Sequence, residues 1–118
     1  MTLDDFFGDH DDSRRLFEAV RACVEAIGDA GIRVSTSQVG FYRRAGFAYV
    51  WMPGQYLGET DVPLVLTVAL RHRDTSPRWK EVVEPAPGRF THHLELRSPD
   101  EVDAEVRDWL AEAWALAE

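Results

Sequence analysis

The residues best suited to chemistry in this chain are basic side chains on two predicted strands. His93 and Arg97 alternate with apolar residues in the run 90–97, and Arg71 follows the apolar run 63–70. Because side chains alternate between the two faces of a strand, all three are predicted on the face opposite the apolar residues. Guanidinium and imidazolium groups hold carboxylates and phosphates. The pattern therefore predicts an anion-binding site on Arg71, His93 and Arg97.

Two further residues are predicted to border that site. Arg44 lies in the short glycine-containing turn between two β-rich runs, and Trp79 lies in a long loop over residues 72–89. Long ordered loops often carry function, so Trp79 is a candidate lid residue. The alternative is structural: the basic residues lie on a solvated face and pair with Glu95, and Trp79 packs as a plug over the sheet.

Catalytic and metal-binding patterns are absent from the sequence. His92 and His93 are adjacent on one strand, so their side chains point to opposite faces and cannot share a metal ion. His92 lies on the apolar side and is predicted to be a buried, hydrogen-bonded core residue. The chain has no phosphate-binding loop, dinucleotide-binding glycine motif, nucleophile elbow or zinc-protease motif. We therefore predict no catalytic residue, no metal ligand and no cofactor.

Charge is sorted along the chain. Residues 1–31 carry eight acids and three bases, residues 99–118 carry seven acids and one base, and residues 32–98 carry nine bases and six acids. The terminal segments are predicted to be helical and the middle to be a sheet, so we expect acidic helices on a mildly basic sheet. The net charge of −8 argues against binding to nucleic acid or to an anionic membrane.

Hydrophobic periodicity predicts the elements that position these residues. Residues 13–30 form one helix, whose apolar stripe consists of Leu16, Phe17, Val20, Cys23, Val24 and Ile27. The runs 32–43, 47–52, 62–71 and 90–97 are extended, and residues 79–83 form either a short strand or a single turn. A capping box of Ser98 and Glu101, with Pro99 at the first helical position, starts a helix that runs to the end of the chain.

The predicted fold is one α+β domain over residues 1–118. It has two layers: an N-terminal helix and a C-terminal helix cover one face of an antiparallel sheet of four to five strands. The hydrophobic content of 45% and charged content of 29% are those of a soluble globular protein. The acidic N-terminal residues lack the features of a signal peptide, and no apolar run is long enough to span a bilayer, so a cytoplasmic location is expected.

The second strand carries an unusual number of aromatic residues. Phe47, Tyr49 and Trp51 are predicted to share one side, and Ala48, Val50 and Met52 share the other. Since both sides are apolar, the strand is either buried on both sides or presents an exposed aromatic patch.

Three segments resemble a bacterial family of small domains of unknown function. They are Arg43–Trp51, Thr91–Leu96 with its paired histidines, and Glu105–Leu110 near the end of the chain. Domains of this family occur alone or at the end of larger sequences of the "predicted transport protein" type. The resemblance covers nearly the whole chain and implies a compact α+β domain, with no activity or catalytic residue attached to it.

These observations favour a non-enzymatic binding module whose basic sheet face engages an anionic small molecule or a partner protein. A homodimer is the first alternative, with Tyr49, Trp51 and Trp79 buried between open sheet faces. An enzyme that uses His92 or His93 as an acid or base is the second.

Overall fold

The structure is a computed structural model that describes residues 1–58 and 60–118. Its elements are α1 (Leu3–Phe7), α2 (Asp11–Ile27), β1 (Gly31–Val34), β2 (Val39–Tyr42), β3 (Gly46–Trp51), α3 (Gly54–Leu57), β4 (Leu64–Leu70), β5 (Glu81–Ala86), β6 (Arg89–Leu96), a 3₁₀ turn η1 (Pro99–Glu101) and α4 (Ala104–Leu116).

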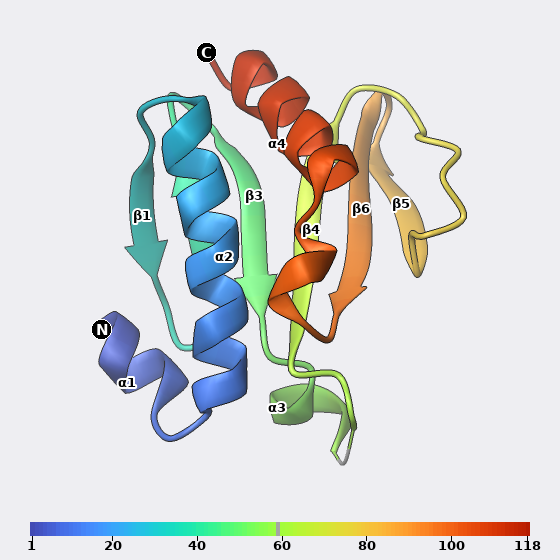
Figure 1. The fold of residues 1–118 in the computed structure, drawn as a ribbon. Helices are drawn as coiled ribbons and strands as arrows, with labels where there is room; N and C mark the ends of the chain where they lie inside the picture. The colour runs from blue at the N-terminus through green and yellow to red at the C-terminus, as the bar shows by residue number, and fades with distance from the viewer. Residues whose placement is uncertain (59) are drawn as a thin grey trace.

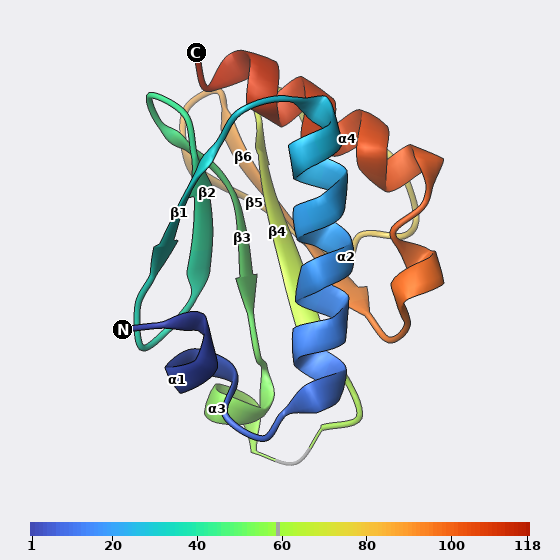
Figure 2. The ribbon, with the colours of Figure 1, turned by 60° about the vertical axis from the view of Figure 1, so that its left-hand side comes forward.

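The strands form one antiparallel sheet in the order β1-β2-β3-β4-β6-β5. Helices α2 and α4 lie on one face of this sheet, as Figures 1 and 2 show from two directions. None of the helices in the described part of the chain covers the opposite face, which we call the open face. The predicted two-layer α+β architecture, with an antiparallel sheet between an N-terminal and a C-terminal helix, is confirmed.

The sheet has six strands among the described residues, where four to five were expected. The run 32–43 is two strands because a turn interrupts it: the Ser35 hydroxyl accepts hydrogen bonds from the amides of Ser37 and Gln38. Residues 79–83 were predicted to form either a short strand or a single turn. The structure has a strand there, the edge strand β5, which pairs with β6.

The ends of the helices differ from the expectation by a few residues. Helix α2 starts at Asp11 and ends before Gly28, whose amide donates to the carbonyl of Val24. The predicted capping box of Ser98 and Glu101 is formed, but it caps only the turn η1. Asp103 then caps α4 by accepting a hydrogen bond from the amide of Val106. The short helix α3 was not predicted.

A row of phenylalanine rings fills the core between α2 and the first strands. Phe17 lies 5.2 Å from Phe7 and 5.9 Å from Phe41, and Phe41 lies 6.4 Å from Phe47, measured between ring centroids. The predicted grouping of Phe47 with Tyr49 and Trp51 is wrong. A β-bulge opposite Phe41 and Tyr42 inserts one extra residue in β3, and this turns Phe47 into the core.

Gly28 is expected to tolerate no side chain. A Cβ atom there would overlap the indole of Trp114, which is held by a hydrogen bond to the carbonyl of Asp29 and by the Arg43 guanidinium 3.6 Å from its ring centroid. Gly28→Ala should lower the free energy of unfolding by about 1–3 kcal/mol, because a packed ring must move. Urea denaturation would measure the loss. Gly31→Ala is the control, since its new methyl group would meet nothing closer than 3.9 Å, and an equal loss there would contradict the explanation.

Candidate functional site

The structure places Arg71 and Arg97 at opposite ends of the sheet. Strands β4 and β6 pair antiparallel, with Leu70 opposite Phe90 at one end and Leu64 opposite Leu96 at the other. Arg71 follows the first of these pairs and Arg97 follows the second. The seven residues of β4 lie between the two arginines and separate them by about 26 Å. One small anion therefore cannot contact both, and the predicted three-residue cluster is not formed.

His93 lies on the open face within a row of hydrogen bonds. The Trp51 indole donates to Thr67 Oγ1 at 3.1 Å, and Thr67 Oγ1 lies 2.8 Å from His93 Nδ1. Burial lowers the pKa of His93, and the nearby charge of Glu81 only partly offsets this. His93 is therefore largely uncharged near neutral pH and adds no standing positive charge to the sheet face.

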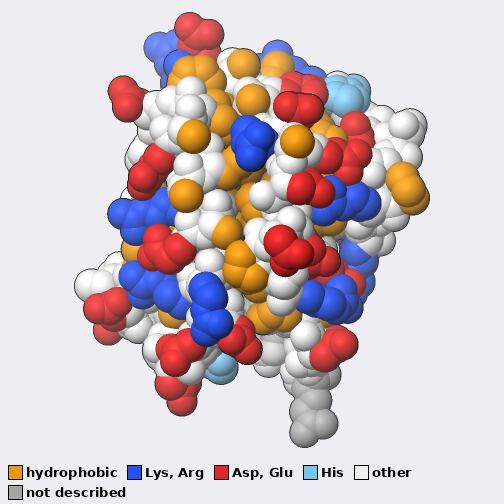
Figure 3. Space-filling model, in the orientation of Figure 1, with side chains coloured by type: hydrophobic (Ala, Val, Ile, Leu, Met, Phe, Trp, Pro, Cys, Tyr) orange, Lys and Arg blue, Asp and Glu red, His pale blue; other side chains and the backbone are white. Residues whose placement is uncertain are grey.

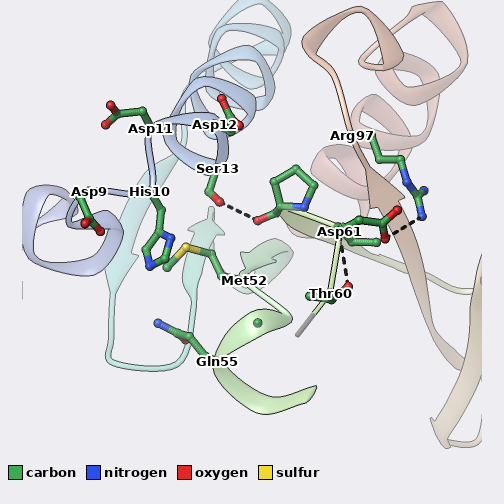
Figure 4. Close-up of a pocket in the computed structure, with 13 residues that line it drawn as sticks. Asp9, His10, Asp11, Asp12, Ser13, Met52, Gln55, Thr60, Asp61 and Arg97 are labelled. Carbon is green, nitrogen blue, oxygen red and sulfur yellow. Dashed lines mark hydrogen bonds and ion pairs between the residues drawn. The ribbon is translucent and has the colours of Figure 1, made fainter. Parts of the chain in front are cut away.

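Arg97 lies among acids. Its guanidinium is 3.8 Å from Asp61 and 3.7 Å from Glu95, and Lys80 forms a further ion pair with Glu95 at 2.9 Å. Arg97 also borders a hollow of about 660 Å³ that we call the acidic hollow. In Figure 4, His10 lies beside Met52 within this hollow, while the carboxylates of Asp11 and Asp12 point away from both.

Trp79 is buried on the helix side of the sheet, far from the position of a lid over the open face. Its ring centroid lies 4.0 Å from that of Trp109 and 4.8 Å from that of His92, and its indole donates to Asp74 Oδ2 at 2.8 Å. His92 is fully buried, and its Nε2 accepts a hydrogen bond from the amide of Asp74. The prediction of a buried, hydrogen-bonded His92 is confirmed at Nε2, whereas the buried Nδ1 has no hydrogen-bond partner among the described residues. Segment 71–80, which we call the strap, is thus pinned to the core.

A second hollow, of about 500 Å³, lies at the end of β4 where Arg71 is. Arg71 and Arg89 both border it, and we call it the basic hollow. The pairs Ala69–Thr91 and Leu70–Phe90 bring the next two residues, Arg71 and Arg89, opposite one another. Two like charges across a strand pair repel each other, so an anion between them would be stabilised.

The arginines at this end of the molecule have no acidic side chain paired with them among the described residues. Neither Arg71 nor Arg89 forms an ion pair with any acid in the described part of the chain, and the same holds for Arg44. The turn of Arg44 adjoins the basic hollow, since Ala45 lines it and the Arg44 amide donates to the carbonyl of Ala117. Of the five predicted site residues, Arg71 lines the basic hollow and Arg44 directly precedes the lining residue Ala45.

The helix-covered face differs from the basic hollow in its distribution of charge. Acidic and basic side chains are mixed over α2 and α4 in Figure 3. The arginines of α2 pair with neighbouring acids, for example Arg14 with Glu18 and Arg21 with Glu25, each at 3.1 Å. Arg33, Arg43, Arg73 and Arg107 also form no ion pair with a described acid, so Arg71 and Arg89 are distinguished by lying opposite one another beside a hollow. The two hollows lie at opposite ends of the molecule: the end of β4 and the C-terminal end of α4 are at the top of Figure 1, and α3 is at the bottom.

The wall of the basic hollow is mostly apolar. It combines the end of α4, the hairpin between β5 and β6, and the neighbouring ends of β3 and β4. Tyr49 supplies a hydroxyl group, and burial raises the pKa of Tyr49 although the charge of Arg89 opposes that change. The neighbouring Tyr42 hydroxyl raises the pKa of Tyr49 as well, so Tyr49 is neutral at physiological pH and its hydroxyl interacts with that of Tyr42. This arrangement can bind an anion, and the described residues that line it include no histidine, cysteine, aspartate or glutamate.

Sequence reasoning missed Arg89. Its role depends on the pairing of β4 with β6, and these strands are separated in sequence by β5. The signal that could have found it is the dipeptide Pro87-Gly88, which marks a hairpin turn directly before Arg89. Had the segment 81–86 been assigned as a strand, that turn would have placed Arg89 at the start of β6.

No three His, Cys, Asp or Glu side chains of residues 1–58 and 60–118 come together in a way that could hold a metal ion. None of the described helices has the length and apolar content needed to cross a membrane.

Comparison with known protein families assigns this chain to one family by its sequence. The family described as a domain of unknown function, DUF5655, matches residues 3–117, and the chain belongs to it. The resemblance to a family of small domains of unknown function is thereby confirmed. Neither the curated proteins nor the solved structures contain a significant match.

Proposed function

We propose that this chain is a non-enzymatic binding module that takes an anionic ligand in the basic hollow. The observation that carries the proposal is the opposed pair Arg71 and Arg89, which lies beside a hollow and has no acidic partner in the described structure. An arginine guanidinium presents two parallel N–H groups to a carboxylate or phosphate, which suits it to this task.

The net charge of −8 does not argue against such a site. At an ionic strength of about 0.1 M, charges more than about 10 Å apart are largely screened from one another. The local field at the basic hollow is therefore set by its own arginines rather than by the acids at the opposite end of the molecule. We also propose, from the sequence, that the protein is bacterial and cytoplasmic. Its resemblance to domains found in sequences of the "predicted transport protein" type suggests a connection with transport proteins.

Isothermal titration of the whole chain with inorganic phosphate and with small carboxylates would test the proposal. Arg71→Gln and Arg89→Gln should each weaken binding by about tenfold or more, because each removes charged hydrogen bonds to the anion. Arg97→Gln is the matched control, since Arg97 lies at the opposite end of the same strands. Equal losses for all three variants would contradict the proposal, as would no binding to the unmodified protein.

One observation favours a competing function, a homodimer that packs through the open face. Tyr42, Tyr49 and Trp51 lie on that face and no helix covers them, with Tyr42 and Tyr49 in edge contact at 6.0 Å. Trp79 was expected in the dimer interface as well, but it is buried inside a single chain. Analytical ultracentrifugation at micromolar concentration separates the two functions. A dimer that Trp51→Glu dissociates would favour this alternative, whereas a monomer would exclude it.

A further inference from the structure

We propose that the ligand of the basic hollow is an amphipathic anion, a carboxylate or phosphate carried on a short apolar body. This inference rests on the proposed function and adds the chemical class of the ligand. It follows from the contrast between the two arginines at the hollow and the apolar wall behind them.

The anionic head is assigned to Arg71 and Arg89. Both side chains are exposed, border the same hollow and carry a charge that no described acid balances. Thr91 is also in the wall, and its hydroxyl already donates to the carbonyl of Val83 at 3.4 Å. The charged groups of the wall are therefore the two guanidinium groups, which fixes the sign of the head.

The apolar body is assigned to the wall between the sheet and α4. Leu70, Phe90, Leu116 and Ala117 line this part of the hollow. The Arg73 guanidinium lies 5.4 Å from the Phe90 ring centroid, so one face of that ring is already covered. A volume of about 500 Å³ is within the range of about 300–1,000 Å³ that is typical of small-molecule sites. Leu70 and Ala117 are buried, whereas Phe90 and Leu116 are half-buried, so a bare inorganic anion would leave the exposed parts of Phe90 and Leu116 in contact with water.

The hairpin beside the hollow disfavours an added peptide strand. Pro85 and Pro87 both line the hollow, and neither has an amide N–H to offer to an extended chain. Pairing between β5 and β6 is also irregular between Val83 and Ala86. Strand addition needs a regular row of free backbone groups. A small molecule therefore fits this surface better than a peptide.

Titration with a series of carboxylates tests the inference. Acetate, butanoate and hexanoate carry the same head on bodies of increasing length, and phosphate and phenyl phosphate form a second pair. Affinity should rise by about fourfold for each methylene group that enters the hollow, and phenyl phosphate should bind more tightly than phosphate. Arg71→Gln should weaken the binding of every member of both series.

Three outcomes of this titration are distinct. A rise in affinity with length supports the amphipathic ligand. Equal affinity for acetate and hexanoate, with loss in Arg71→Gln, overturns the apolar body but leaves the anion-binding function standing. No binding of any member overturns both.

A variant that fills the hollow tests where the body lies. Leu116 is a half-buried residue of α4 that lines the hollow, so Leu116→Trp should reduce the affinity for hexanoate to that for acetate while acetate binding is unchanged. Val83→Leu is the control, because Val83 is a 38% exposed residue of β5 outside the lining. Thermal unfolding of both variants shows whether they are folded. Unchanged hexanoate affinity in a folded Leu116→Trp protein would overturn the assignment.

Discussion

Trp79→Ala is expected to lower the free energy of unfolding by about 3–5 kcal/mol. The side chain is only 9% exposed, its ring packs between those of Trp109 and His92, and its indole N–H is bonded to Asp74. Alanine would leave a large cavity under the strap and remove this hydrogen bond. Urea denaturation followed by circular dichroism would measure the loss.

Trp79→Phe is the matched control for that result. It keeps an aromatic ring against Trp109 and removes the hydrogen bond to Asp74, so a loss of about 1–2 kcal/mol is expected. The folded Trp79→Phe protein should bind anions as the unmodified protein does, because Trp79 does not line the basic hollow. A loss below 1 kcal/mol for Trp79→Ala, or weaker anion binding by Trp79→Phe, would contradict a purely structural role.

Stability is expected to fall as the pH is lowered from about 6.5 to 4.5. Burial lowers the pKa of His92, and the backbone carbonyls of Val68 and Phe90 and the carboxylate of Asp74 only partly oppose this. The charge of His72 acts in the same direction as burial. In the unfolded chain the imidazole takes up a proton at its ordinary pKa, whereas in the folded chain it stays neutral to lower pH.

The sign of the effect follows from proton binding. Below pH 6.5 the unfolded state binds more protons than the folded state, so the free energy of unfolding falls by up to about 1.4 kcal/mol per pH unit for each such histidine. The pKa of His93 is lowered in the same way, so it adds to the slope. The pKa values of Asp74 and Asp103 are also lowered, but a carboxyl group titrates in a more acidic window, below about pH 4.

Urea denaturation at several pH values between 7.5 and 4.5 measures this slope. His92→Gln should flatten it by the contribution of one histidine, since glutamine can still accept the hydrogen bond from the Asp74 amide and does not titrate. His93→Gln should remove the remaining contribution. A slope that survives in the double variant would show that other groups control the acid stability of the protein.

Local patterns in the sequence were enough to predict the layers of this fold. The apolar stripe of α2, the capping residues around Ser98 and the alternation in β6 each depend on neighbouring residues, and the structure contains all three. His92 was correctly assigned to the core because it falls on the apolar side of β6. Features set by neighbours in sequence were therefore predictable.

Features set by contacts distant in sequence were not predictable. Alternation indicates the face on which Arg71 and Arg97 lie, but not the end of the sheet, which depends on the pairing of β4 with β6. The bulge that turns Phe47 inward depends on its pairing with β2. The same limit applies to Trp79, whose contact with Trp109 joins the strap to the last helix.

The most direct test of the account is a titration of isotopically labelled protein with hexanoate, observed by nuclear magnetic resonance. We expect the side-chain Nε–H signals of Arg71 and Arg89 to shift together with the amides around Leu116 and Thr91, and the signals around Arg97 to stay in place. Shifts around Arg97 and Asp61 in the acidic hollow, or no shifts at millimolar hexanoate, would contradict the claim that the basic hollow is the binding site.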